Sequence, residues 1–190
     1  KPLARKMIGV FRLSLFFILC LFAFLTQPII LLLFHNQRVI CFIPSIWHSA
    51  VCKIMRIRVI CEGRPSKASP TFFTSNHISY LDIPVLGQIK PAYFIAKKDV
   101  ANWPFFGWLT KLQKTVFIQR EKTGLQDAGE KIKTHLNQRR SLVVFPEGTS
   151  GNGENVLPFK SSLFHYLMHP DLKVNVTIQP VTIKIVAING

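Results

Sequence analysis

The chain opens with two long apolar stretches. Only Ser14 interrupts the apolar run over residues 13–25, and the segment 7–27, just before Pro28, holds 21 residues. As a helix rising ~1.5 Å per residue, that segment spans roughly 31 Å, close to the hydrocarbon thickness of a bilayer. Pro28 is expected to kink or end this helix. A polar turn at residues 35–38 separates it from a second apolar stretch at residues 39–55.

Basic residues flank both apolar stretches, at Lys1, Arg5, Lys6, Arg38, Lys53, Arg56 and Arg58. With positive charge at every end, the positive-inside rule indicates no clear crossing of the membrane. A hairpin that enters and leaves by one face, or lies partly in the interface, explains this pattern as well as two spans do, and we favour the hairpin. A secretory signal peptide is the rival interpretation of the first stretch, but no small-residue cleavage site follows it.

The rest of the chain alternates short strand-like and helix-like patterns. β-Branched and aromatic residues predict strands at residues 57–61, 71–74, 93–96, 116–118, 142–145 and 174–185. Apolar spacing predicts helices at residues 125–136 and 159–168. The alternation indicates an α/β domain over residues 57–190, with a mixed or largely parallel sheet flanked by helices. Residues 1–56 are expected to form an N-terminal two-helix membrane anchor.

Charge narrows the class of partner. Lysine and arginine number 24 against 9 acidic residues, a formal net charge of +15, which favours an anionic surface or a phosphorylated small molecule. Zinc-finger spacing, an RNP-like strand and a basic region followed by heptads are all missing from the sequence, so we expect no nucleic-acid partner. A basic chain with an apolar N-terminus fits an anionic membrane lipid better. The four cysteines lack CxxC spacing, which indicates free thiols facing the cytosol.

The sharpest cluster of reactive residues follows the strand at 71–74. In Asn76-His77-Ile78-Ser79-Tyr80-Leu81-Asp82, the His and the Asp can meet where the strand ends and a helix begins with Asp82 in its first turn. The carboxylate would then hold one imidazole nitrogen and leave the other as a base. Ser79 and Asp82 also fit a helix-capping pattern without any catalytic role, and the two interpretations can coexist.

A second polar turn, Phe145-Pro146-Glu147-Gly148-Thr149-Ser150, follows the strand at 142–145. Its Pro and Gly predict a turn that exposes Glu147 and several backbone amides at the carboxyl end of the strand, where open α/β sheets bind ligands. Such amides can hold a polar head group or stabilise an oxyanion. The alternative is a tight turn with no further role.

Basic side chains and a histidine pair supply weaker candidates. Arg120 follows the strand at 116–118 and suits bidentate binding of phosphate or carboxylate, although a solvated surface arginine is the alternative. Lys160 can add a point charge to the same pocket. His165 and His169 are spaced like zinc ligands on one helix face, but no third ligand is evident, so we expect no metal.

The order of these motifs resembles the four blocks of the lysophospholipid acyltransferases, which include the bacterial 1-acyl-glycerol-3-phosphate acyltransferases. The matching residues are His77-x4-Asp82, Phe117-x2-Arg120, the turn at 145–150 and Gln179-Pro180-Val181. The resemblance covers residues 57–185. It implies that His77 deprotonates the acceptor hydroxyl while Asp82 orients the ring. The hydroxyl then attacks an acyl-CoA or acyl-carrier-protein thioester, with no covalent enzyme intermediate, metal or cofactor.

The same resemblance implies the binding residues. It places head-group contacts at Glu147, Gly148 and Thr149, the acceptor's phosphate at Arg120, and the acyl chain at Pro180 and Val181.

Departures from the blocks bear on the acceptor. Lys114 and Gln119 stand where the second block commonly has Gly and Asp, and residues 157–162 resemble a subgroup that includes lyso-ornithine lipid acyltransferases. Acceptors of that subgroup carry a carboxylate or a zwitterion and no phosphomonoester. We expect acyl transfer to lysophosphatidic acid, giving phosphatidic acid, with lyso-ornithine lipid as the alternative lysolipid acceptor. A non-catalytic basic protein that binds membrane or nucleic acid is the alternative outside enzymes.

Two further expectations concern location and extent. The catalytic domain is expected at the cytoplasmic face of the inner membrane. The chain stops soon after the fourth block, where relatives usually continue, which indicates truncation at the C-terminus.

Overall fold

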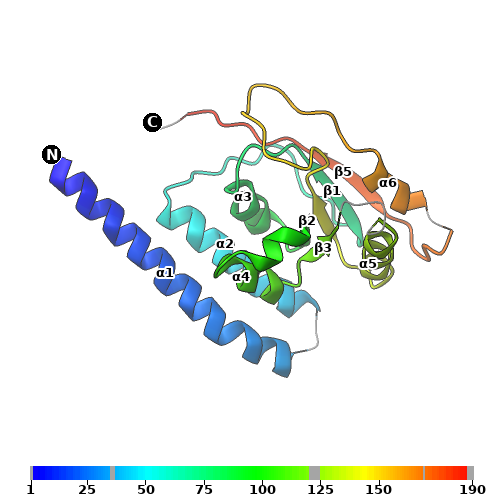
Figure 1. Cartoon of the computed structure of the whole chain (residues 1–190), viewed down its shortest axis with the longest axis horizontal. Helices are drawn as coiled ribbons and strands as arrows, with labels where there is room; N and C mark the ends of the chain where they lie inside the picture. The colour runs from blue at the N-terminus through cyan, green and yellow to red at the C-terminus, as the bar shows by residue number, and fades with distance from the viewer. Residues whose placement is uncertain (1, 35–36, 120–124, 169, 188–190) are drawn as a thin grey trace.

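A computed structural model describes residues 2–34, 37–119, 125–168 and 170–187 (Figure 1). Two helices come first, α1 at Pro2–Leu33 and α2 at Gln37–Ile54. Strands and helices then alternate. The strands are β1 (Thr71–Ser75), β2 (Tyr93–Lys97), β3 (Val116–Ile118), β4 (Leu142–Val144) and β5 (Thr177–Val181). The helices among them are α3 (Asp82–Ile89), η1 (Lys98–Asn102), α4 (Phe106–Leu112), α5 (Leu125–Asn137), α6 (Ser162–His165) and η3 (Tyr166–Met168).

The five strands form one sheet in the order β3-β2-β4-β1-β5, and every pairing is parallel. β1 and β4 are neighbours, with Thr74 opposite Val144, so both strands end at the same edge of the sheet. The predicted α/β class with a largely parallel sheet is therefore confirmed. Parallel strands need crossover connections, and the helices that make them lie on the two faces of the sheet.

Alternating side chains of β1 bury the two faces in separate cores. Phe72 packs with Ile132 and Leu136 of α5, whereas Phe73 packs with Leu86 of α3. Successive residues of a strand point to opposite faces, which is why two adjacent phenylalanines serve two layers. Helices α5 and α6 thus cover one face, while α3, α2 and α4 cover the other with α1 outside them (Figure 1).

Helix α1 is the most exposed apolar element. It continues through Pro28 to Leu33, so Pro28 does not end the helix, and of the two expected effects the kink stays a prediction. By length and composition, its segment Lys6–Leu33 could cross a membrane, and only 17% of it is buried inside the protein. Phe16 and Cys20 pack against α2 and α4, while Phe11 and Phe22 are exposed. The helix therefore indicates membrane association.

Helix α2 packs mainly inside the protein. Its buried side chains are Ile40, Ser45, His48, Val51 and Cys52. The predicted two-helix anchor is thus shown only in part, because α1 alone carries a long free apolar surface. The division of the chain at residue 56 stays a prediction.

Three predicted elements differ from the structure. Residues 57–61 form no strand, and the segment 174–185 is a strand only at Thr177–Val181. β1 is paired with β4 on one side and with β5 on the other, so it has no free side for a further strand such as the one predicted at 57–61. β1 is also only five residues long, so it pairs with no more than five residues of β5. Strand propensity alone does not form a strand without a neighbour. The helix predicted at 159–168 is limited to α6 and the 3-10 turn η3.

Candidate active site

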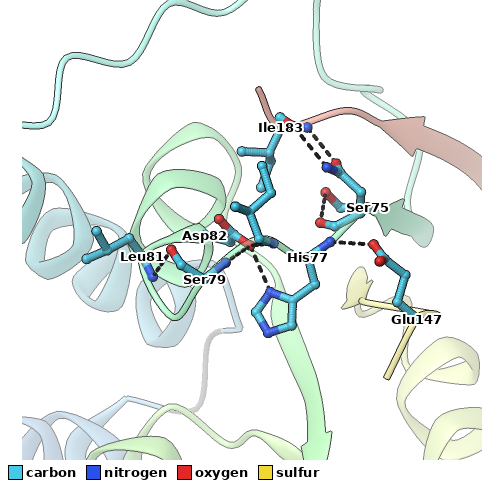
Figure 2. Close-up of polar contacts among 9 residues, drawn as sticks. Ser75, His77, Ser79, Leu81, Asp82, Glu147 and Ile183 are labelled. Carbon is cyan, nitrogen blue, oxygen red and sulfur yellow. Dashed lines mark hydrogen bonds and ion pairs between the residues drawn. The ribbon is translucent and has the colours of Figure 1, made fainter. Parts of the chain in front are cut away.

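The end of β1 brings a histidine and an aspartate together. The chain leaves β1 at Ser75, turns through residues 76–81, and enters α3 at Asp82. His77 Nδ1 lies 2.8 Å from Asp82 Oδ2, a hydrogen bond between side chains five residues apart (Figure 2). The structure therefore places this pair as the sequence predicted, at the carboxyl edge of the sheet. Their catalytic role stays a prediction.

The same carboxylate oxygen also caps the turn before α3. Asp82 Oδ2 accepts hydrogen bonds from the backbone amides of Ile78 at 2.6 Å and Ser79 at 3.0 Å, and the residue is buried. Ser79 Oγ in turn accepts from the amide of Leu81 at 3.1 Å. Capping and pairing with the histidine thus coexist in one carboxylate. Three donors fix its position, so it is well placed to fix the imidazole.

The rest of the imidazole is held by an aromatic contact. Phe145 stacks on the His77 ring with centroids 4.1 Å apart and planes inclined by 19°. Within the described residues, Nε2 of His77 makes no hydrogen bond, and the side chain remains 12% exposed. If Nδ1–H donates to Asp82, the lone pair of Nε2 faces outward as a base. This arrangement suits proton abstraction from a hydroxyl.

Glu147 connects the two predicted motifs. Its Oε1 accepts from the backbone amide of His77 at 2.7 Å (Figure 2), and its Oε2 accepts from the amide of Leu157 at 2.8 Å. The side chain is 4% exposed, so the expectation that the turn exposes Glu147 was wrong. The cause is the parallel pairing of β1 with β4, which brings the two strand exits together. Its predicted contact with a head group stays a prediction, but both carboxylate oxygens already bind backbone amides.

The turn after β4 wraps around the histidine. Gly148 is buried and has a φ of +75°, a backbone conformation that favours glycine, and its amide donates to the carbonyl of Phe145. The amide of Gly151 donates to the carbonyl of His77 at 2.8 Å. Between these two, Thr149 is exposed, and the amides of Thr149 and Ser150 bond to nothing in the described part of the chain. Two backbone donors next to Gly151, whose own amide holds the His77 carbonyl, therefore have no partner among the described residues.

The other predicted binding residues are more scattered. Lys160 is exposed, and its backbone amide donates to the carbonyl of Pro146 at 2.9 Å, so it lies close behind the turn. Pro180 and Val181 pair with Thr74 and Ser75 at the end of β1. Arg120, predicted to bind the acceptor's phosphate, lies outside the described residues.

Sequence reasoning missed two contributors to this edge. Asn76 exchanges two hydrogen bonds with the backbone of Ile183, at 2.9 and 2.7 Å, and so ties the segment after β5 to the histidine loop (Figure 2). Lys97 ends β2 opposite Ile118 of β3 and is exposed. Lys97 could have been found from the sequence, because it is a basic residue that directly follows a predicted strand, and the same pattern singled out Arg120 as a candidate.

No group of three or more His, Cys, Asp or Glu side chains within the described ranges is arranged to hold a metal ion. His165 is exposed on α6, and its predicted partner His169 lies outside those ranges. That the chain needs no metal or cofactor stays a prediction.

Known proteins resemble this chain in sequence over much of its length. The family model described as Acyltransferase matches residues 56–184. The lyso-ornithine lipid O-acyltransferase of Rhizobium meliloti (strain 1021) is 36% identical over 156 residues, covering 78% of this chain and 52% of that protein. The 1-acyl-sn-glycerol-3-phosphate acyltransferase of Neisseria gonorrhoeae is 31% identical over 115 residues, covering 59% and 45%. The chain spans about half the length of the curated relatives it matches.

A solved structure has the same fold. The crystal structure of the 1-acyl-sn-glycerophosphate (LPA) acyltransferase PlsC from Thermotoga maritima aligns with a TM-score of 0.67 and 21% identity. The alignment covers 94% of this chain and 83% of that one. At this identity the likeness shows the fold alone.

Proposed function

The chain belongs to the acyltransferase family, and we propose that it transfers a fatty acyl group from a thioester to the hydroxyl of a lysolipid at a membrane surface. The observation that carries the proposal is the buried Asp82 carboxylate 2.8 Å from Nδ1 of a histidine whose Nε2 bonds to no residue that the structure describes. A lipid hydroxyl is a poor nucleophile until a base removes its proton. The proposed base is His77, at the exits of β1 and β4.

The proposed reaction needs a single attack. Nε2 of His77 takes the proton as the hydroxyl oxygen bonds to the thioester carbonyl carbon, and Nδ1–H keeps its hydrogen bond to Asp82. The tetrahedral intermediate collapses with loss of thiolate, which the imidazolium can protonate. A positioned base contributes roughly 10²–10⁴ in rate. Because thiolate is a good leaving group, no covalent enzyme intermediate is required.

The free amides of Thr149 and Ser150 are candidates to stabilise the oxyanion. They belong to a loop that the amide of Gly151 fastens to the carbonyl of His77, which keeps the loop close to the main chain of the proposed base. Donors held in place before the reaction stabilise developing charge without reorganisation, which contributes roughly 10²–10³ per donor. Glu147 supports this loop because its carboxylate accepts hydrogen bonds from the backbone amides of His77 and Leu157.

Lyso-ornithine lipid is the first acceptor to test. Four relatives that are 34–36% identical and cover 73–78% of this chain are named lyso-ornithine lipid O-acyltransferases. Their names support this acceptor ahead of lysophosphatidic acid, which the four sequence blocks alone favoured. Lys114 and Gln119, which depart from the second block, point the same way. The exposed Lys97 and Lys160 can pair with a carboxylate as well as with a phosphate.

Lysophosphatidic acid is the second candidate acceptor. Relatives named 1-acyl-sn-glycerol-3-phosphate acyltransferase are 31% identical in Neisseria gonorrhoeae and 43% identical over 89 residues in Helicobacter pylori (strain J99 / ATCC 700824). Under this assignment Arg120 and Lys160 contact the phosphomonoester. Acyl-CoA and acyl-carrier protein are equal candidates as donors, because both offer the same thioester.

The proposed location is the cytoplasmic face of the membrane. Helix α1 presents a long apolar surface, and the net charge of +15 attracts anionic lipid with ~1 kcal/mol per well-placed basic residue. Lysolipid and product are both poorly soluble, so a site opening at the interface would receive and release them there. The thioester donors are made in the cytosol, which supports that side.

A purified-protein assay tests these proposals together. Wild type and His77→Ala are incubated with each acceptor and with each donor, and the diacyl product is quantified by mass spectrometry. We expect product with wild type and a loss of roughly 10²–10⁴ in turnover for His77→Ala, with vesicle binding unchanged. His165→Ala, an exposed histidine on α6, serves as the matched control and should keep its activity.

The outcomes of this assay distinguish the two acceptors from each other and the enzyme from a non-catalytic protein. Product from lyso-ornithine lipid alone supports the first acceptor, and product from lysophosphatidic acid alone overturns it. In the second case Lys160→Ala should raise the acceptor KM. Equal turnover in wild type and His77→Ala, or salt-sensitive binding without turnover, would leave the non-catalytic basic protein as the better explanation.

A further inference from the structure

Helix α2 is joined directly to α3, the helix that begins with Asp82. Ser45 Oγ donates a buried hydrogen bond of 2.7 Å to the carbonyl of Gly87 in the last turn of α3. One residue further along α3, Gln88 Nε2 lies 3.3 Å from Cys52 Sγ of α2. These contacts fix the C-terminal end of α3 to a helix that precedes the sheet, and Asp82 begins the same short helix. The position of the Asp82 carboxylate therefore depends on α2 as well as on β1.

The closest approach of the two helices is a histidine ring on a glycine. The ring of His48 is buried and lies on Gly87, where an added Cβ would fall 2.6 Å from Nε2 and even closer to Cδ2. Only glycine leaves room for this ring. Glycine inside a helix destabilises it by roughly 0.5–1 kcal/mol relative to alanine. Gly87 destabilises α3 in this way at the very point where α3 contacts α2. We infer that the close approach of the two helices matters to the fold.

The same ring begins a second line of contacts to the site. His48 meets Phe94 of β2 edge to face with centroids 6.0 Å apart, Phe94 stacks near Phe145 at 6.4 Å, and Phe145 stacks on His77 at 4.1 Å. Two aromatic rings thus separate His48 from the proposed base. Burial lowers the pKa of His48 to about 4, against the effect of a hydrogen bond with Gln113, so the ring is neutral. A neutral ring in this place acts through packing.

We propose that His48 is a positioning residue through which α2 sets the geometry of the His77–Asp82 pair. Its ring contacts α3, the helix that begins with Asp82, and it contacts His77 indirectly through the rings of Phe94 and Phe145. The positions of both members of the pair therefore depend on one residue of α2. The N-terminal helices are then part of the catalytic unit rather than a tether. This inference rests on the proposed acyl transfer.

A compensating pair of substitutions tests the contact. Gly87→Ala adds a methyl group that collides with the ring and should push α3 away from α2. Because a shift of about 1 Å at a reacting group can cost roughly 10²-fold in rate, we expect kcat to fall tenfold to a hundredfold while the acceptor KM stays near the wild-type value. The pH–rate profile should shift too, since its limbs report the imidazole. His48→Ala alone should also lower kcat, because it removes the ring that holds α3. Combined with Gly87→Ala it removes the collision as well, so the double variant should recover part of the Gly87→Ala loss and stay below wild type.

Gly129→Ala is the matched control. Gly129 lies in α5, on the other face of the sheet, and a Cβ there would fall 2.6 Å from the ring of Tyr166. This variant places the same methyl group against an aromatic ring, far from the histidine pair. It should lower Tm about as much as Gly87→Ala does, with kcat and the pH–rate profile unchanged.

Two results would overturn the inference: Gly87→Ala keeping the wild-type kcat and pH–rate profile despite a lowered Tm, or the double variant recovering nothing. If Gly87→Ala does not fold, Ser45→Ala makes the milder test, because it removes only the hydrogen bond to the carbonyl of Gly87. Its kcat should fall with the KM retained, and an unchanged kcat counts against the proposal.

Failure of the proposed function would look different. In that case wild type itself makes no product with any donor or acceptor. The inference is then decided by proton NMR of the His77 Nδ1–H, whose resonance lies far downfield while the hydrogen bond to Asp82 is intact. Loss or broadening of that resonance in Gly87→Ala, but not in Gly129→Ala, supports positioning by α2. Equal spectra overturn it.

Discussion

Glu147 accepts a 2.7 Å hydrogen bond from the backbone amide of His77, so a residue 70 positions later in the chain holds the main chain beneath the proposed base. Its other oxygen holds the amide of Leu157. The carboxylate thereby joins the loop after β1 to the long loop after β4. It supports the proposed base through the backbone of both loops.

Glu147→Gln should therefore act as a structural and a catalytic lesion at once. The amide side chain offers one acceptor instead of two and turns an N–H₂ group toward a backbone donor, which costs about 1–3 kcal/mol at a buried site. We expect a lower Tm and a lower kcat with little change in the acceptor KM, measured by thermal unfolding and steady-state kinetics. A raised KM with unchanged Tm would instead support direct contact with a head group.

Asp82→Asn tests the second member of the pair. With its Oδ1 in the place of Oδ2, asparagine can still accept from the amides of Ile78 and Ser79 and from Nδ1–H of His77, but it lacks the negative charge that stabilises the imidazolium formed when His77 takes the proton. Turnover should fall by roughly 10²–10⁴, as expected for loss of a positioned base, while lysolipid binding persists. Stopped assays across pH measure the loss.

Asp127→Asn is the control for that variant. Asp127 pairs with Lys131 on the exposed surface of α5, where an ion pair contributes about 0–1 kcal/mol. Its turnover should match wild type. If Asp82→Asn also matched wild type, the carboxylate would be a helix cap alone.

The histidine pair was predictable because it is local. Five residues separate His77 from Asp82, and a strand exit followed by a helix start brings such residues together whatever the remaining fold. The same holds for the strands at 71–75, 93–97, 116–118 and 142–144, whose apolar patterns were read within one or two residues. Local patterns of this kind can be interpreted without knowing which distant segments pack against them.

What escaped prediction depends on distant segments. The burial of Glu147 follows from the parallel pairing of β1 with β4, which a polar turn in isolation does not reveal. The packing of His48 on Gly87 could not be read from the apolar pattern of residues 39–55, because lipid and protein select the same side chains. Pro28 was expected to kink or end a helix that continues to Leu33. A helix interrupted at one hydrogen bond persists where its neighbours support it.

The apolar surface of α1 should control membrane binding. Phe11 and Phe22 are 67% and 64% exposed, and burying such a side chain in an apolar phase contributes about 1.5–3 kcal/mol. Each replacement by serine should weaken binding to vesicles of phosphatidylglycerol and phosphatidylethanolamine roughly ten- to hundredfold, measured by co-sedimentation. Ile178→Ser, at an exposed position of the edge strand β5, should bind as wild type does. Binding that survives both phenylalanine changes but disappears in high salt would assign attachment to charge alone.

The buried neutral His48 should make stability depend on pH. Burial lowers its pKa to about 4, whereas the unfolded chain takes up a proton near the ordinary value of 6.5. Between these values the unfolded state binds more protons than the folded state, so the free energy of unfolding falls as the pH drops from about 6.5 to about 4. The full shift corresponds to about 3 kcal/mol. His135, whose pKa is also lowered to about 4 by burial and by the charges of Arg140 and Lys114, adds a slope of the same sign.

Urea unfolding at a series of pH values measures this slope in wild type and in His48→Gln, which cannot titrate and keeps a polar side chain of similar size. The variant should be less stable than wild type near neutral pH because the ring no longer packs on Gly87, yet its stability should fall less steeply below pH 6.5. His165→Gln, at an exposed position, should keep the wild-type slope. Equal slopes in wild type and His48→Gln would mean that the His48 ring takes up its proton without unfolding, and so that its environment is wetter than the packing of α2 on α3 implies. A neutral, dry contact at this point is what lets α2 hold α3 in one position near neutral pH, where the proposed base must also be unprotonated.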